Sequence, residues 1–330
     1  MKLFISALVF GYIFSYFPPF IHTYINFNIA AIILLVIGLY ASVYEIDITI
    51  LKKHTHMVLS AITFGVILKS AIIGSLFFLI TRNMLSFLLG VAVAQIDPLS
   101  VSYLLKSKDG SFSTVGRTIL RVWSSFDDPM TILLSIFFVA PIILGTFYRN
   151  PFTYIDEVFF NILFAFVIFV CNKFVNSEIG KKVLLFFSLF IAIICNLTLG
   201  ISLIALFLRP TLGKALSSSV TIAFYIGVLL LGLTVTITLQ SVLAGVLLGV
   251  IAFVAQIIAT FLIAKKLTKT DKFHLAFAQY NGITSIGLGI FFQHSFPSIT
   301  SIIALAVVTI NSIYYLANHV LYKKITSNLL

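Results

Sequence analysis

The chain has 330 residues, of which 60% are hydrophobic and only 9% are charged, and its mean hydropathy is +1.15. A soluble domain needs far more charge to cover its surface, so this composition excludes one. The net charge of +11 lies between the apolar runs, which indicates loops on the inner side of a membrane rather than a nucleic-acid surface. Because the runs are continuously apolar, they predict helices and not the alternating strands of a transmembrane barrel.

Ten apolar runs have about the length of one membrane span each. In chain order they cover 3–17, 28–45, 57–80, 84–105, 115–145, 157–176, 218–239, 241–264, 273–293 and 298–321. An eleventh run, 182–209, is long for one helix and short for two. If it turns near Asn196–Gly200 and crosses twice, every basic cluster lies on the side of Lys2, including Lys265–Lys272 and Lys323–Lys324. We therefore expect about twelve spans in the cell (plasma) membrane, with both termini cytoplasmic.

Two parts of the chain echo each other. VIGLYASVYEIDITI (36–50) and LLGLTVTITL (230–239) both end a span with Gly-Leu and β-branched residues. Each precedes a long span and then a span interrupted in its middle, at AQIDPLS (94–100) and QYNGITS (279–285). With twelve spans the two parts cross in opposite directions. Inverted repeats with interrupted helices at matching positions are typical of the binding site of a secondary transporter.

A small set of polar side chains falls near the middle of the predicted spans. The charged ones are Lys69, Asp97, Arg121, Asp127 and Asp128, and the neutral ones include Gln95, Asn196, Gln256 and Asn281. A charge at the centre of a spanning helix costs ~2.5–3.5 kcal/mol, so these groups should face protein or water rather than lipid. Two positive and three negative charges leave one negative charge uncompensated, which suits a monovalent cation or a proton better than an anion.

Asp97–Pro98 predicts a break in its helix, because proline has no N–H and displaces the carbonyl of Ala94. That carbonyl, Gln95 and Asp97 would supply oxygen ligands at membrane depth, where irregular backbone is tolerated only inside protein or beside a cavity. The alternative is a kinked helix with a solvated Asp97 at its end. Asn281–Gly282 marks the second interruption, although small polar residues also mediate helix packing in membranes.

Asp127 and Asp128 are adjacent and point about 100° apart on a helix, so one can face a cavity and the other a neighbouring helix. Pro129 frees a further carbonyl beside them. Burial and a nearby like charge favour a protonated carboxyl group, whereas a bound cation favours the ionised one, so proton and cation would compete for one site. The alternative is a structural ion pair, for instance with Arg121. Lys69 either snorkels toward the membrane surface or pairs with one of the acids.

No P-loop, dinucleotide fingerprint or nucleophile elbow occurs in the chain. The sequence therefore predicts no cofactor and no enzyme activity, and active transport would be driven by ion gradients. An intramembrane aspartyl enzyme is disfavoured, because such enzymes place their acids on separate helices and no second acid motif fits.

Four motifs in consistent order resemble those of monovalent cation:proton antiporters of the sodium/hydrogen exchanger superfamily. GLYASVYEIDITILKKH (38–54) resembles the family's GLELDLRELRKH, and AQIDPLSVSYLLK (94–106) resembles ATDPVAVLALLK. RVWSSFDDPMTIL (121–133) resembles EGESLLNDATAIVL, and NGITSIGLG (281–289) is similar to RGAVSLALA. By this resemblance the chain is identified as a divergent member that lacks the first family helix.

The resemblance implies an all-helical fold of two inverted six-helix repeats joined by a linker helix, with two crossed broken helices. Residues 1–330 would form a single transporter unit. Its core would cover roughly 57–145 and 241–321. Its scaffold would cover roughly 3–50 and 182–239, and 157–176 would be the linker helix. The scaffold would form a homodimer, and movement of the core against it would expose the site to each side in turn.

Individual positions carry the resemblance further. Asp128 matches the carboxylate that the family uses for both cation and proton, and Asp97 matches the acid of the Asp-Pro break, so both are expected to bind a monovalent cation. Ser124 matches the motif serine. Asp127 stands where electroneutral members have Asn and electrogenic members have Asp, which favours electrogenic exchange.

Other positions depart from the family pattern. Ile96 replaces the motif threonine, Asn281 stands at the family arginine, and Gln256 occupies a position that is often basic. Arg121 falls where many members have glutamate. Our hypothesis is that Arg121 supplies the missing positive charge and neutralises Asp127 or Asp97, which would make the exchange electroneutral.

These features predict a secondary antiporter that exchanges protons for Na⁺, K⁺ or Li⁺ by alternating access, with Asp128 as the shared carboxylate. Two alternatives stay open. One is a sodium-coupled organic anion transporter on the same fold, with the anion held at helix N-termini of a break. The other is a degenerate membrane protein without transport activity, which the altered threonine, glutamate and arginine positions would favour.

Overall fold

The computed structural model describes residues 2–16, 25–44, 46, 55–107, 112–145, 151–263 and 267–321. All regular structure in these ranges is helical, as the sequence predicts. The prediction of the inner side used basic residues that lie outside the described residues, among them Lys265, Lys266, Lys323 and Lys324.

The described helices form twelve segments, which agrees with the expected number. The first five are α1 (Lys2–Phe14), α3 (Phe27–Tyr44), the continuous α5 (Thr55–Ser60), η1 (Ala61–Leu68) and α6 (Lys69–Thr81), the interrupted α7 (Leu85–Val93) and α8 (Pro98–Ser107), and the continuous α9 (Thr114–Ile132), η2 (Leu133–Val139) and α10 (Ala140–Ile143). The other seven are α12 (Pro151–Phe174), α13 (Glu178–Ile194), α14 (Thr198–Ile204), α15 (Lys214–Thr234), α16 (Leu239–Ile263), the interrupted α17 (Lys269–Ala276) and α18 (Ile283–Phe292), and the continuous α19 (Ile299–Tyr315) and η3 (Leu316–Leu321).

Eight of these helical stretches are long and apolar enough to cross a membrane. Exposed aromatic side chains cover the outer sides of α12 and of the shorter α13, such as Phe159 on α12 and Phe186 and Phe190 on α13. Large apolar surface of this kind is stable against lipid and unfavourable against water. The chain is therefore a multi-pass membrane protein.

Residues 182–209 turn back on themselves, as predicted. α13 ends at Ile194, Asn196 adopts the left-handed conformation (φ 54°) that asparagine tolerates better than most residues, and α14 begins at Thr198. α14 has only seven residues, which corresponds to about 10 Å of helix against ~30 Å of hydrocarbon. The second arm is thus short, and Asn161 Oδ1 anchors it to α12 by accepting from Gly200 N (2.7 Å).

Two helices break in the middle, and the extended segments at their breaks cross. Residues 94–97 separate α7 from α8, and residues 277–282 separate α17 from α18. Asp97 N donates to Tyr280 O at 2.9 Å, which joins the two segments directly. Pro98 is the first residue of α8, where a missing N–H costs no helical hydrogen bond. The predicted pair of crossed broken helices is confirmed.

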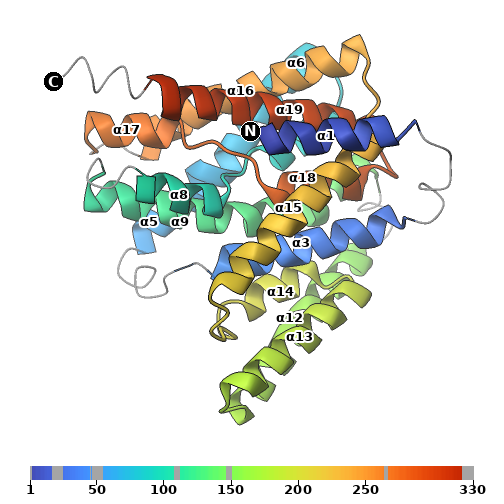
Figure 1. The fold of residues 1–330 in the computed structure, drawn as a ribbon, viewed down its shortest axis with the longest axis vertical. Helices are drawn as coiled ribbons and strands as arrows, with labels where there is room; N and C mark the ends of the chain where they lie inside the picture. The colour runs from blue at the N-terminus through green and yellow to red at the C-terminus, as the bar shows by residue number, and fades with distance from the viewer. Residues whose placement is uncertain are drawn as a thin grey trace.

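Helices from both halves of the chain surround this crossing. α9 packs against η1 and α3, α16 packs against α6 and α19, and α18 packs against α3. In Figure 1, α3, α15 and α18 lie in the middle of the molecule, and α12, α13 and α14 lie together at its lower end. The crossing is thus enclosed by protein, as irregular backbone in a membrane requires.

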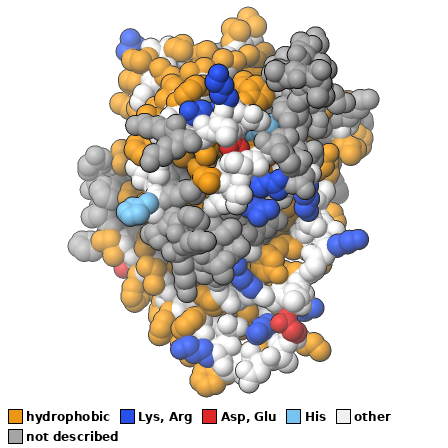
Figure 2. All heavy atoms as spheres, turned by 90° about the vertical axis from the view of Figure 1, so that its left-hand side faces the viewer, with side chains coloured by type: hydrophobic (Ala, Val, Ile, Leu, Met, Phe, Trp, Pro, Cys, Tyr) orange, Lys and Arg blue, Asp and Glu red, His pale blue; other side chains and the backbone are white. Residues whose placement is uncertain are grey.

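Basic side chains gather on one face of the molecule. Figure 2 shows Lys and Arg grouped on the face that lies at the left of Figure 1, where α8 ends and α9 and α17 begin. Acidic side chains are sparse in the same view. Such an asymmetry between the two ends of a helical bundle is the pattern from which membrane orientation is predicted.

Candidate functional site

The α9 helix places both adjacent carboxylates at the crossing of the broken helices. Asp127 is fully buried and Asp128 is 2% exposed. Ser113 is the N-cap of α9, and its Oγ accepts from Gly116 N at 3.0 Å. Pro129 lies inside α9, and the π-helical η2 follows at Leu133. π-helical turns inside α-helices are frequent at functional sites.

Asp127 joins three parts of the structure. Its Oδ2 lies 3.5 Å from Lys69 Nζ and accepts from Ile96 N at 2.7 Å. The carboxylate therefore connects α9 to α6 and to the extended segment of the first broken helix. Ile96 has no polar side chain, so only its backbone N–H can donate to Asp127. The helix break leaves this N–H without a helical partner, and the carboxylate accepts its hydrogen bond instead.

Lys69 is fully buried and pairs with an acid, which decides between its two predicted roles. Besides Asp127, its Nζ donates to Gln256 Oε1 (3.1 Å) and Gln279 Oε1 (3.3 Å). It also lies 5.1 Å from the centre of the Trp123 ring, within reach of a cation–π interaction. Lys69 thus places a buried positive charge next to Gln256.

Arg121 does not have the predicted role. Its side chain is exposed, and within the described residues it forms no ion pair with Asp127 or Asp97. The reason is distance along the helix: Arg121 shares a helical face with Asp128, but seven residues earlier means about 10 Å nearer the surface. The hypothesis that Arg121 neutralises a buried carboxylate is wrong, and Lys69 takes that place for Asp127.

Asp128 faces hydroxyl and amide groups from both repeats. Ser42 Oγ, on α3, lies in hydrogen-bond contact with Asp128 Oδ2. The Gln95 amide lies between Asp128 and Ser285, and the orientation that satisfies both directs its nitrogen to Asp128 Oδ1 and its oxygen to Ser285. Thr284, in the first turn of α18, lies next to the same carboxyl group, and its buried hydroxyl makes no hydrogen bond of good geometry to a described residue.

The Ser42 hydroxyl can serve either protonation state of Asp128. It has a single hydrogen but two neighbours, Asp128 Oδ2 and the carbonyl of Gly38 at 2.9 Å. When Asp128 carries a proton, that proton can be donated to Ser42 while Ser42 donates to Gly38. When Asp128 is ionised, the hydroxyl can turn and donate to the carboxylate instead. The pair thus tolerates loss and gain of a proton without an unpaired buried group.

Asp97 lies at the start of α8 and is 9% exposed. Its Oδ2 accepts from both the backbone N and the Oγ of Ser100, each at 2.7 Å, so it caps the helix that Pro98 begins. Across the crossing, Gly282 approaches it so closely that a Cβ there would overlap the Asp97 carboxyl group. Asp97 therefore lies at a helix end, as in the alternative prediction. It is not solvated as that alternative expected, because protein encloses it on most sides.

The amides of the second break satisfy the carbonyls that the first break sets free. Gln279 Nε2 donates to Val93 O (2.8 Å) and Gln95 O (2.9 Å). Asn281 Nδ2 donates to Val93 O (3.2 Å) and Ser285 Oγ (2.6 Å). Asn281, which replaces the family arginine, thus acts as a neutral donor to broken backbone and carries no charge to the site.

Sequence reasoning missed Ser42 and Gln279, although each lies in a motif that was singled out. Ser124, which was predicted as a ligand, is buried, but its Oγ donates to Arg121 O (3.2 Å) on its own helix. Asn196 belongs to the α13–α14 turn and lies outside the site. Ser42 could have been found as a small polar residue one helical turn after Gly38, within an apolar span. Comparison of this motif with the family's acidic motif drew attention away from it.

A cavity of about 660 Å³ leads from one face of the molecule toward the site. Ala41 and Pro98 line it, and they are the chain neighbours of Ser42, which contacts Asp128, and of Asp97. A second cavity, of about 770 Å³, lies at the opposite ends of α3 and α15, where Asn26 and Thr234 line it. The first cavity reaches the residues next to the carboxylates, and the second does not.

Comparisons with known proteins bear on the fold. No family profile matches the sequence, and no curated protein matches it. The solved structure of the sodium proton antiporter MjNhaP1 from Methanocaldococcus jannaschii at pH 8 is 18% identical, with a TM-score of 0.69 over 96% of this chain and 89% of that one. An electron-microscopy structure of the same antiporter is 16% identical, with a TM-score of 0.61 over 98% and 91%.

The chain has the fold of a sodium proton antiporter. This agrees with the fold that the sequence motifs predict, and the low identity agrees with a divergent sequence. Within this antiporter fold, the crossing carries three buried carboxylates and one buried lysine, namely Asp97, Asp127, Asp128 and Lys69. Lys69 pairs with Asp127, whereas Asp97 and Asp128 form no ion pair with a described residue.

Proposed function

We propose that the protein is a secondary antiporter that exchanges protons for a monovalent cation (Na⁺, K⁺ or Li⁺), with Asp128 as the carboxylate that both ions use. The observation that carries the proposal is the surroundings of Asp128: it is buried at the crossing of two broken helices and contacts Ser42, whose hydroxyl suits either protonation state. The shared fold with a sodium proton antiporter supports it.

The exchange rests on competition at one carboxyl group. A proton on Asp128 neutralises it, and a cation can bind only when the proton has left. The cation would then take oxygen ligands from Asp128, Asp97 and the Thr284 hydroxyl, which has no other partner of good geometry among the described residues. Hard monovalent cations prefer such oxygen ligands, and the buried site makes binding of both ions at once unfavourable.

The charge on Asp127 stays fixed during this exchange. It is held at 3.5 Å from Lys69 and by the backbone of Ile96, so uptake of a proton or binding of a cation would break a buried pair. One proton then replaces one monovalent cation at Asp128. We therefore propose electroneutral exchange, in which Asp127 has a structural role.

Access would alternate between the two faces. The cavity that reaches Ala41 and Pro98 is open on the basic face, which we assign to the cytoplasm because of its Lys and Arg side chains. Both termini would then be cytoplasmic and the protein would lie in the plasma membrane. Core helices of 57–145 and 241–321 would move against a dimeric scaffold of 3–50 and 182–239, with 157–176 as the linker.

Reconstitution into vesicles tests the proposal. With an imposed pH gradient, addition of Na⁺, K⁺ or Li⁺ should start a proton flux in the wild type that Asp128→Asn abolishes. Asp156→Asn, which removes an exposed acid on α12, is the matched control and should leave the flux unchanged. Equal flux from wild type and Asp128→Asn would refute the proposal and favour the degenerate alternative. Sodium-driven uptake of an organic anion without proton flux would favour the anion transporter.

A further inference from the structure

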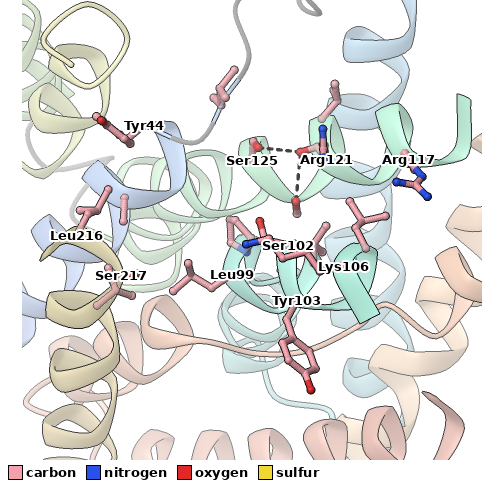
Figure 3. A pocket seen from close by; sticks show the side chains of 18 of the residues that line it. Tyr44, Leu99, Ser102, Tyr103, Lys106, Arg117, Arg121, Ser125, Leu216 and Ser217 are labelled. Atoms are coloured by element: carbon pink, nitrogen blue, oxygen red, sulfur yellow. Dashed lines mark hydrogen bonds between the residues drawn. The ribbon is translucent and has the colours of Figure 1, made fainter. Parts of the chain in front are cut away.

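The cavity on the basic face has cationic walls. Lys106 from the last turn of α8 and Arg117 and Arg121 from α9 line it, and no Asp or Glu is among the described residues that do. Figure 3 shows these three side chains around one opening, with Tyr44 and Ser217 on its other side. Three positive charges on the path to a cation site repel the cation that the site would bind.

The charges form an ordered row. Arg117 and Arg121 are four residues apart and therefore share one face of α9, and Ser124, Ser125 and Asp128 continue that face inward. Arg121 is exposed to the cavity, and the nearby hydroxyls of Ser124 and Ser125 donate to its backbone carbonyl (3.2 and 2.7 Å). The exposed guanidinium group of Arg121 is thus a donor that the cavity offers to a ligand.

A second feature favours negative charge at the same place. The 21-residue helix α15 begins at the cavity, and its N-cap is Gly213, which has no side chain to cap the first N–H groups. A helix N-terminus carries a partial positive charge and attracts anions. The volume of about 660 Å³ lies in the range of sites for small organic ligands.

We propose that this cavity binds an oxyanion of the phosphate class, either a free phosphate or the phosphate of an anionic lipid headgroup, between Lys106, Arg117 and Arg121. Guanidinium groups bind phosphate oxygens in pairs, and a lysine adds a point charge. The bound anion neutralises the cavity walls. Its effect on cation flux rests on the proposed function, whereas its binding does not.

Binding is tested on the purified chain. In detergent, the thermal midpoint is followed against inorganic phosphate at constant ionic strength. In nanodiscs, retained lipid is measured by native mass spectrometry with phosphatidylcholine alone or mixed with phosphatidylglycerol. Phosphate binding in detergent identifies the free ion as the source, and retention of phosphatidylglycerol alone identifies the lipid. Binding of neither, or the same midpoint shift with chloride, overturns the proposal.

Variants locate the site. Arg121→Gln should weaken binding of the anion roughly tenfold, because it removes a charged hydrogen-bond donor. Lys182→Gln removes an equal charge from an exposed position on α13 and should bind as the wild type does. Arg121→Lys keeps the charge and should bind with intermediate strength, which guards against a folding defect in the Gln variant. Equal binding by Arg121→Gln and wild type overturns the proposal.

The transport assay separates this inference from the antiport proposal. In vesicles, the anion should raise the cation-dependent proton flux of the wild type and leave that of Arg121→Gln unchanged. Binding without any cation-dependent flux would refute antiport and leave the anion site standing. Uptake of radiolabelled phosphate that is lost in Asp128→Asn would make the anion a transported substrate and overturn its assignment as a bound neutraliser.

Discussion

Lys69 Nζ lies 3.5 Å from Asp127 Oδ2, and both side chains are completely buried. Fifty-eight positions separate the two residues in the chain, yet they form a fully buried ion pair. The pair joins α6 to α9 at the depth of the helix crossing. It also determines which carboxylates keep a free charge, because Asp127 is already neutralised.

Removing one partner of this ion pair should destabilise the protein more than removing both partners. Lys69→Met leaves a buried, unpaired Asp127 and is expected to cost about 3–5 kcal/mol of unfolding free energy, whereas Lys69→Met with Asp127→Asn should cost clearly less. Thermal and denaturant unfolding in detergent measure both. A double variant as unstable as the sum of the two single variants would show that the residues do not interact.

Transport should not respond to membrane potential. If Asp127 keeps its charge on Lys69, each cycle moves one proton against one cation and transfers no net charge. Cation-dependent proton flux in vesicles is therefore expected to be equal at imposed potentials of either sign. A flux that rises when the potential favours net charge movement would give Asp127 a place in the transport cycle.

Gly282 should tolerate no side chain. A Cβ at this position would overlap the Asp97 carboxyl group, so Gly282→Ala must shift one broken helix against the other. We expect a loss of about 1–3 kcal/mol of stability and of most transport activity. Gly289→Ala, in the same helix, is the control, because its Cβ would meet its nearest neighbours at 3.4–3.5 Å, an ordinary contact. Similar activity in both variants would contradict close approach at the crossing.

Acid should destabilise the protein partly through Asp271, which lies outside the spanning segments. Burial alone would raise the pKa of Asp271, but hydrogen bonds from Ser113 N (3.0 Å), Ser113 Oγ (2.7 Å) and Thr268 Oγ1 (2.8 Å) lower it below its usual value. A lowered pKa in the folded state stabilises the protein above the pKa of the unfolded chain, and this contribution is lost as pH falls through the folded pKa.

The corresponding measurement is the unfolding midpoint as a function of pH. Asp271→Asn should be less stable than the wild type at neutral pH, and the difference should shrink as pH falls below about 4, the usual Asp range. Asp156→Asn, on an exposed acid, should show no such convergence. A constant difference between Asp271→Asn and wild type at all pH values would assign the loss to packing alone.

Several features of the site followed from sequence because they are local. Pro98 and Gly282 mark the breaks through the backbone constraints of proline and glycine, which act wherever the helix lies. Asp127 and Asp128 drew attention because charge within an apolar run is costly. The turn after α13 was predicted from the charges of the flanking loops, and Asn196 with its left-handed backbone lies at that turn.

The partners of these residues were decided only by the tertiary structure. Sequence comparison favoured Arg121 as the partner of a buried acid and left the role of Lys69 open, whereas position along α9 placed Arg121 in the cavity and α6 brought Lys69 to Asp127. Ser42 and Gln279 became site residues because α3 and the second break reach the first break from distant parts of the chain. Composition and local backbone chemistry therefore determined that buried carboxylates lie within the spans of a membrane protein with broken helices. Which charge each carboxylate meets was set by the packing of helices, because an ion pair depends on distance in space and not in sequence.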